Sequence, residues 1–153
     1  MPQLDPIDRK VLHQLQQDST QSLEHLGEQV GLSRNACWRR VRALQDQGVI
    51  TAQVALLSPK LLNLALTVFI QLRTDSHDAR WMDQFAKATR AMPEILGVYR
   101  MSGDLDYLIK ARVADVDAYD RLYRKLIAQV PLSDVSASFV MEEIKETTAL
   151  PVL

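Results

Sequence analysis

Hydrophobic side chains change their spacing near residue 51, and this change constrains the fold more than any other feature. In residues 1–50 they recur every three to four residues, which is the period of an amphipathic helix. Later in the chain they alternate with polar residues in short runs, which is the period of a strand. The sequence therefore predicts an α+β protein with a helical domain at 1–50, an extended linker at 51–63 and a mixed domain at 64–153.

The helical part is predicted to form three helices with a tight turn before the last. The first is expected to begin after Asp5, whose carboxylate suits an N-cap position. The second runs from Ser22 to Gly31, because glycine readily adopts the left-handed conformation that ends many helices. The third has Ser33 as its N-cap and ends near Gly48. Three short helices with a glycine-containing turn of this length indicate a helix-turn-helix.

Gly27 lies inside the second of these helices, where a glycine costs about 1 kcal/mol relative to alanine. A structural requirement should therefore keep it there. Close approach of the second and third helices across their turn is a sufficient requirement.

The third predicted helix concentrates positive charge. Residues 34–42 hold four arginines and no carboxylate, whereas the whole chain has a net charge of −1. When the second helix of a helix-turn-helix enters the major groove, arginine can bridge two acceptors of guanine, and asparagine can pair similarly with adenine. Other cations in such helices only hold phosphates. The residues predicted to contact double-stranded DNA are Ser33, Arg34, Asn35, Trp38, Arg39, Arg40 and Arg42.

Structural alternatives exist for this helix. Arginine-rich helices are also common as solvated surfaces, without any partner. Trp38 can pack against the neighbouring helix instead of lying along the DNA backbone, and packing is the favoured interpretation for that side chain. The absence of acids, the glycine turn and the preceding helix together favour DNA binding.

The remainder of the chain predicts a ferredoxin-like domain. Its strands are identified by alternation and its helices by apolar side chains one turn apart. The expected elements are a strand at 65–74, a helix at about 79–91, strands at 95–101 and 106–113, a helix at 116–130 and a strand at 136–145. The order βαββαβ is that of the split βαβ, ferredoxin-like fold.

Cysteine content and hydropathy indicate the cellular compartment in which the protein is expected. Cys37 is the single cysteine, so no internal disulfide forms and a reducing compartment is expected. Its position on the inward stripe of the third helix predicts a small buried side chain rather than a redox sensor. No apolar run approaches the length needed to span a bilayer, and the first residues are acidic where a signal peptide is basic. We expect a cytoplasmic protein.

No metal site, cofactor or catalytic centre is expected. His13, His25 and His77 lie in three separate segments without a second ligand at metal-binding spacing. The sequence contains no Walker loop and no dinucleotide fingerprint. Glu142 and Glu143 are adjacent on a predicted strand and so point to opposite faces, with one expected to pair with a surface lysine. The protein is therefore not expected to be an enzyme.

Five segments in order resemble the leucine-responsive/asparagine-regulator (Lrp/AsnC) family of prokaryotic transcription factors. The segments are LDPIDRKVL, LGEQVGLSRNACWRRVRALQDQGVI, ALLSP, MSGDLDYLIKARV and FVMEEIK, and the resemblance covers nearly the whole chain. It implies an N-terminal winged helix-turn-helix and a C-terminal βαββαβ domain of the RAM, or ACT-like, type that binds small molecules, usually amino acids. It also implies dimers formed through the C-terminal sheets, which assemble into tetramers or octamers.

The resemblance further implies an effector site between domains of different dimers, at the glycine loop between the central strands. The corresponding positions are Met101, Ser102, Gly103, Asp104, Leu105, Asp106, Val116, Ser138, Phe139 and Val140. Gly103 would let backbone amides approach a carboxylate, and Asp104 or Asp106 would meet an ammonium group.

The identity of the effector stays open at this stage. Leu105 stands where many relatives carry an aromatic residue, and the turn at Pro131-Leu132 lacks the usual glycine and is one residue short. The acidic loop also has the composition of an ordinary hairpin turn with solvated aspartates. The chain looks closest to the branch of the family associated with sulfur amino acids such as cysteine.

Three hypotheses of function follow. The first is a transcription regulator that binds a specific DNA sequence and responds to an amino acid. The second is an architectural, chromatin-like DNA-binding protein with little effector control. The third is a small amino-acid-binding enzyme or enzyme subunit, whose arginines only solvate a helix.

Overall fold

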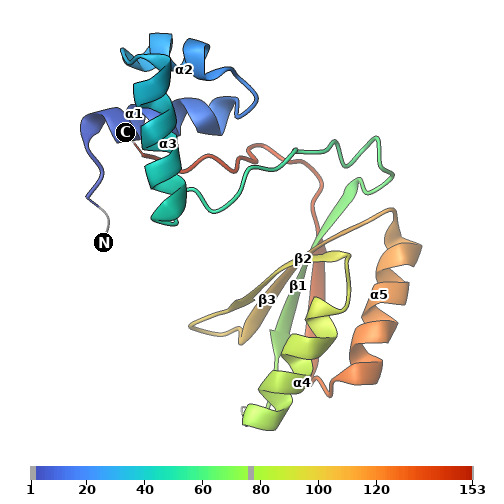
Figure 1. Ribbon diagram of the computed structural model, residues 1–153. Helices are drawn as coiled ribbons and strands as arrows, with labels where there is room; N and C mark the ends of the chain where they lie inside the picture. The colour runs from blue at the N-terminus through green and yellow to red at the C-terminus, as the bar shows by residue number, and fades with distance from the viewer. Residues whose placement is uncertain (1–2, 76–77, 153) are drawn as a thin grey trace. The chain divides into compact units, whose positions relative to one another are not determined.

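The computed structural model describes residues 3–75 and 78–152, which form two compact units (Figure 1). The first unit contains the chain up to Leu56 together with the chain from Lys145 onward, and the second is Leu57–Ile144. The sequence assigned everything from residue 64 onward to one domain. The structure instead places the segment after Ile144 with the helical unit, because Val152 packs against the core of that unit.

Three helices make up the first unit, in the predicted order. They are α1 (Pro6–Gln17), α2 (Leu23–Val30) and α3 (Arg34–Asp46). The two predicted N-caps, Asp5 and Ser33, each accept a backbone N–H of the following turn, and Ser22, the predicted start of the second helix, does the same. At α1 the cap is reciprocal, because Asp8 also accepts the N–H of Asp5, which completes a capping box.

Gly27 lies where α2 closely approaches the turn that leads to α3, as its position in the sequence predicted. A Cβ atom added there would lie 2.6 Å from the carbonyl oxygen of Leu32, and main-chain atoms cannot move aside as a flexible side chain can. Gly31 ends α2 in the left-handed conformation, with φ of 75°. The two glycines together allow α2 and α3 to be joined by only three residues, 31–33.

The core of the first unit is formed by side chains from all three helices. The buried members are Val11, Leu12, Leu26, Val30, Cys37 and Leu44. Cys37 has no exposed surface, which confirms the predicted burial, and this burial raises the pKa of its thiol. After α3, Val49 and Ile50 pack against the same core, and no strand follows among the described residues of this unit.

The second unit has the predicted βαββαβ order. Its elements are β1 (Leu66–Arg73), α4 (Ala79–Arg90), β2 (Ile95–Arg100), β3 (Tyr107–Val113), α5 (Val116–Gln129) and β4 (Asp134–Phe139). The strands form one antiparallel sheet in the order β2-β3-β1-β4. The last strand ends six residues before the predicted limit, because Val140 already bonds to Thr67 near the start of β1 and little of the partner strand remains to pair.

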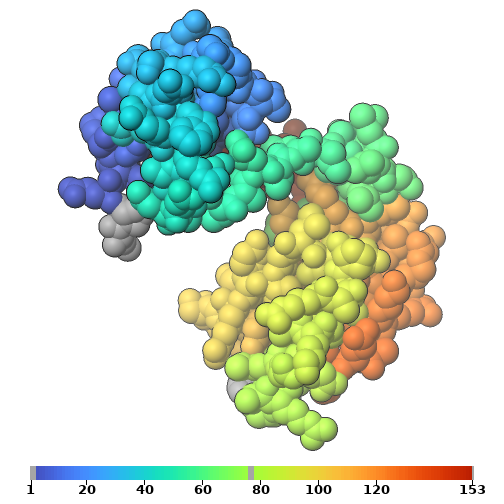
Figure 2. All heavy atoms as spheres, in the orientation of Figure 1, coloured from blue at the N-terminus to red at the C-terminus, as the bar shows by residue number. Residues whose placement is uncertain are grey.

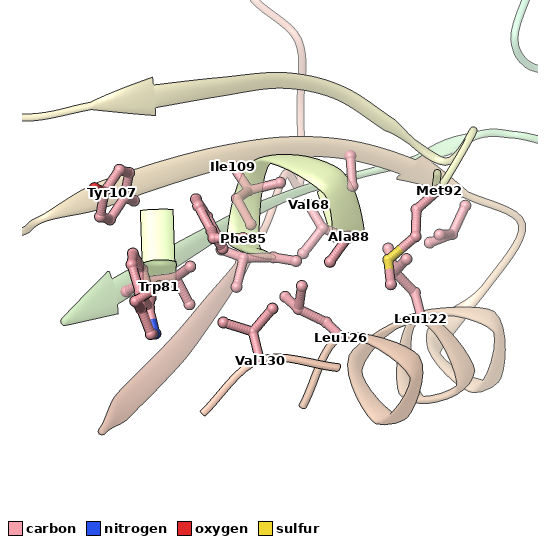
Figure 3. Packing of buried hydrophobic residues seen from close by; sticks show 14 residues of the cluster. Val68, Trp81, Phe85, Ala88, Met92, Tyr107, Ile109, Leu122, Leu126 and Val130 are labelled. Atoms are coloured by element: carbon pink, nitrogen blue, oxygen red, sulfur yellow. The ribbon is translucent and has the colours of Figure 1, made fainter. Parts of the chain in front are cut away.

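Both helices cover one face of this sheet and enclose the second core (Figure 3). Residues of β3 alternate between buried and half-buried, so Tyr107 and Ile109 point into the core. On α4, Trp81 and Phe85 stack with their ring centroids 5.0 Å apart. Phe85 also lies 4.8 Å from the ring of Tyr107, which fixes the helix against the sheet. The opposite face of the sheet has no helix over it within this unit.

Candidate functional site

The outward face of α3 is open to solvent. Asn35, Arg39 and Arg42 are exposed and lie at the i, i+4, i+7 spacing of one helical face. Trp38 is 55% exposed, so the favoured prediction that it packs against a neighbouring helix is not what the structure shows. Figure 2 shows α3, in cyan, at the surface of the first unit. At the start of this face, the hydroxyl of Ser33 accepts the N–H of Ala36 and caps the helix.

Carboxylates of α2 and of α3 itself pair with two of the arginines. The guanidinium of Arg34 lies 3.0 Å from Glu24 of α2, and that of Arg42 lies 3.3 Å from Asp46 one turn later. Both pairs are more than half exposed, so solvent screens them and they exchange partners readily. Arg39 has no ion-pair partner among residues 3–75 and 78–152, which leaves its charge available at the centre of the face.

Arg40 is engaged inside the domain. Its guanidinium lies 2.6 Å from a carboxylate oxygen of Asp5 and 2.7 Å from one of Asp8, and only 32% of its side chain is exposed. The backbone N–H of Asp8 and this guanidinium hold the pKa of Asp5 below its usual value, and the two carboxylates raise the pKa of Arg40. The DNA contact predicted for Arg40 stays a prediction, but the structure gives the side chain an internal partner that ties α3 to the start of α1.

The predicted effector loop connects β2 to β3 and is held by backbone hydrogen bonds. The N–H of Met101 donates to the carbonyl of Asp106, and the N–H of Asp106 donates to the carbonyl of Leu72. One carboxylate oxygen of Asp106 accepts the N–H of Thr74 at 2.8 Å, which ties the loop to the end of β1. Of the two aspartates expected to meet an ammonium group, Asp104 is exposed and Asp106 has this structural task.

Gly103 lies at the tip of the loop in a conformation that favours glycine. Its φ is +112°, and a Cβ atom added there would meet no atom within 4 Å. The requirement for glycine is therefore one of backbone conformation, and the space in front of the loop is open. Ser102 and Leu105 flank this tip on the same connection.

The other predicted effector positions lie elsewhere on the second unit. Val116 begins α5 and is 59% exposed. Ser138 pairs with Phe69 and Phe139 pairs with Val68, so these two side chains point to opposite faces of the sheet. Phe139 faces the helices and meets the ring of Tyr119 edge-on, with centroids 5.2 Å apart.

Within one chain the loop and the end of β4 do not meet. The loop is bonded at Leu72, whereas Phe139 pairs with Val68, four residues along β1. At about 3.4 Å per residue, this separation is about 14 Å along the strand alone. A single amino acid cannot contact both sets of residues on one subunit. The structure therefore groups Met101–Asp106 in one loop and places Phe139 against Tyr119 of α5, the helix that begins at Val116.

A groove that the sequence did not indicate lies between α4 and β2. It has a volume of about 520 Å³, and its lining includes Met82, Phe85 and Arg90 of α4 with Leu96 and Arg100 of β2. None of the predicted effector residues lines it. It forms because β2 is an edge strand, which depends on strand order and has no local sequence signal.

The part of the chain that the structure describes has neither a cluster of metal ligands nor a membrane-spanning helix. There, no three His, Cys, Asp or Glu side chains gather as metal ligands. His13 and His25 are on separate helices, and His77 lies outside the described residues. None of the described helices has the length and apolar character needed to cross a membrane.

Comparison with known proteins covers both units. Family models match as an AsnC-type helix-turn-helix domain at residues 4–45 and an Lrp/AsnC ligand binding domain at residues 67–150. A glutamate uptake regulatory protein of Zymomonas mobilis subsp. mobilis is 48% identical over 148 residues, which cover 97% of this chain and 90% of that protein.

Solved structures agree with this assignment. The crystal structure of an AsnC family transcriptional regulator from Agrobacterium tumefaciens is 46% identical, covers 97% of each chain and has a TM-score of 0.95. A transcriptional regulator from Neisseria meningitidis, solved as its L-Met complex, is 35% identical, covers 98% of this chain and 97% of that one, and has a TM-score of 0.94. The chain belongs to the Lrp/AsnC family of DNA-binding transcription regulators.

Proposed function

We propose that this regulator binds a specific DNA sequence through α3 and responds to an amino acid bound between C-terminal domains of different subunits. The observation that carries the DNA half is the solvent-exposed face of α3, with Arg39, which pairs with no carboxylate of the described residues, at its centre. Asn35 and Arg39 are one turn apart on that face. Their side chains have the donor and acceptor geometry that reads adenine and guanine edges.

The other cations of α3 take different roles in this proposal. Arg34 and Arg42 exchange their exposed carboxylate partners for DNA phosphates, since exposed ion pairs contribute little stability. Trp38 lies beside this face and packs along the sugar-phosphate backbone. Ser33 remains the helix cap, and the amides of the first turn of α3 favour a phosphate.

A DNA-binding titration tests this half. In Arg39→Ala, affinity for the protein's own upstream DNA should fall by about 1–3 kcal/mol, because a bidentate base contact is lost. Lys87→Ala is the control, because Lys87 is an exposed cation of the second unit paired with Asp83. Unchanged affinity in Arg39→Ala would remove α3 as the reading helix.

Two further measurements separate regulation from simple charge attraction. Binding should weaken with salt by roughly 0.9 log unit per neutralised phosphate per decade of concentration. The protein should prefer its own upstream sequence over bulk DNA by about a thousandfold or more. A preference near one would favour the architectural alternative, and salt-independent binding would contradict a DNA-binding role.

The effector half of the proposal rests on the loop at Gly103. Backbone amides of this open loop bind the carboxylate of an amino acid, and the exposed carboxylate of Asp104 meets its ammonium group. The residues at Val116 and Ser138–Val140 come from another subunit, since they lie too far from the loop within one chain. A sulfur amino acid is the favoured effector, because the neisserial relative at 35% identity was solved with L-Met.

Thermal unfolding with each of the twenty amino acids tests this half. A ligand present at a hundred times its dissociation constant should stabilise the native protein by about 2.7 kcal/mol, a visible shift of the midpoint. Asp104→Asn should remove most of the shift, whereas Asp83→Asn on α4 should keep it. If no amino acid shifts the wild-type midpoint, the amino-acid effector is wrong while the DNA-binding half stands.

A further inference from the structure

Residues from Lys145 onward complete the DNA-binding unit, although residues 57–144 separate them from its first part in the sequence. The side-chain amide of Gln16 on α1 donates to the carbonyl of Leu150 at 3.0 Å and accepts the N–H of the same residue at 2.6 Å. Arg9, also on α1, donates to the carbonyl of Val152 at 3.0 Å. The side chain of Val152 packs against the core of the unit.

These contacts fix one register for the docked segment. An amide side chain that both donates to and accepts from one residue imitates a strand pairing, so a shift by one residue would break both bonds. Leu150 contributes its backbone, because its side chain is 70% exposed. Val152 contributes its side chain. Docking therefore combines a directional polar contact with an apolar one, and it is more than incidental surface proximity.

The residues just before this segment are held on the sheet of the second unit. The chain leaves β4 at Phe139, and the N–H of Val140 still donates to the carbonyl of Thr67. The carboxylate of Glu143 accepts the Thr67 hydroxyl at 2.9 Å and a guanidinium N–H of Arg112 at 2.5 Å. Arg112 is 14% exposed, so the partner of this glutamate is a largely buried arginine rather than the surface lysine that the sequence suggested.

We propose that residues 144–152 are a second tether of the DNA-binding domain, through which β4 acts on α1. The linker that follows α3 is the first connection between the units, and this segment is the other. The tether starts four residues after Val140, the last predicted effector position, so this inference rests on the proposed function for its effector. Gln16 and Arg9 are positioning residues, since they hold the tether and leave the face of α3 untouched.

Gln16→Ala is the central variant, because it deletes both hydrogen bonds to Leu150 and leaves a good helix-forming residue. Gln17→Ala is the matched control, since Gln17 is the next residue of α1 and is exposed. A chain that stops after Thr147 removes the docking segment completely. All variants are measured in the full two-unit protein.

Hydrogen exchange reports docking directly. In Gln16→Ala the amide of Leu150 should exchange at least tenfold faster, and in the shortened chain the buried positions of α1, such as Val11, should also exchange faster. Gln17→Ala should match the wild type. Unchanged exchange of α1 in the shortened chain would overturn the proposal, because the segment would then contribute nothing to the domain.

The DNA affinity with and without effector shows whether effector binding acts on the DNA-binding domain through the tether. The probes are L-methionine and L-cysteine at millimolar concentration, and the readout is the ratio of the two DNA affinities. A typical allosteric ratio is about 5–150-fold, and Gln16→Ala should bring it close to one while effector-free affinity changes by less than about threefold. An undiminished ratio in a variant whose Leu150 amide is released would also overturn the proposal.

Failure of the proposed function would look different. The wild-type protein itself would then show no effect of either amino acid on DNA affinity. In that case the exchange measurement decides alone whether the segment holds the DNA-binding domain.

Discussion

At the scale of single residues, the arginines of α3 perform different tasks although they look equivalent in the sequence. Arg40 binds Asp5 and Asp8, which are 35 and 32 residues away along the chain. Residues 34–42 contain no carboxylate, so the sequence alone groups Arg40 with the DNA contacts. The cap positions were predictable because each depends on a residue three positions away, whereas this ion pair depends on how α1 and α3 pack.

Replacement of Arg40 should affect the stability of the protein. In Arg40→Ala, we expect the unfolding midpoint at pH 7 to fall by roughly 2–4 °C, because two carboxylates lose their partner. The folded-state pKa of Asp5 is lowered, so its stabilising contribution is present above the unfolded value near 3.8 and is lost as the pH falls through the folded value. The gap between wild type and variant should therefore narrow below about pH 4.

Arg42→Ala is the comparison for this measurement. Its exposed pair with Asp46 should contribute much less, so its midpoint should stay close to that of the wild type. Equal midpoints for Arg40→Ala and the wild type at pH 7 would show that the ion pair to α1 is not stabilising.

At the scale of helices and strands, local sequence signals predicted where the helices of the first unit begin, but not where the last strand ends. The first and third helices begin at their predicted caps, and the second begins next to its predicted start at Ser22. The final strand was expected to reach residue 145, because alternation continues in the sequence, but it ends at Phe139. The limit is set by its partner β1, which starts at Leu66, and a partner strand seventy residues away leaves no local trace.

Gly27 is the position where one side-chain atom should disturb a whole element. In Gly27→Ala the added Cβ would lie 2.6 Å from the carbonyl oxygen of Leu32, so the turn between α2 and α3 must shift. We expect a net loss of about 1–3 kcal/mol in unfolding free energy, despite the gain in helix propensity, and weaker DNA binding. Glu28→Ala, an exposed change on the same helix, should be nearly neutral. A stabilised Gly27→Ala would refute the close packing.

At the scale of the whole molecule, the order of elements predicted two units, but the sequence did not indicate which residues return to which unit. The return of residues 145–152 to α1 depends on Gln16 and Val152, neither of which belongs to a recognisable motif. The sequence also did not indicate which face of the sheet is left without helices. Alternation predicts that strands have two faces, whereas only the positions of α4 and α5 decide which face stays uncovered.

That open face is where we expect a second copy of the chain to bind. It carries Phe69 and Leu108, which are half-buried, and Tyr99, which is 51% exposed. Pairing two such faces would remove their apolar surface from water, as sheet packing in other proteins does. Dimers formed in this way would present two copies of α3 to DNA, and two half-sites about one helical turn apart would bind them together.

Leu108→Asp tests this arrangement by sedimentation velocity. A carboxylate at the centre of a packed face costs several kcal/mol, so the variant should sediment as a monomer at concentrations where the wild type is a dimer or larger. Ile127→Asp is the matched control, because Ile127 is a 43% exposed apolar residue of α5, in the helical layer, and it should retain the dimer. If Leu108→Asp remains dimeric while Ile127→Asp dissociates, the subunits associate through their helices, and the half-site spacing expected from sheet pairing no longer applies.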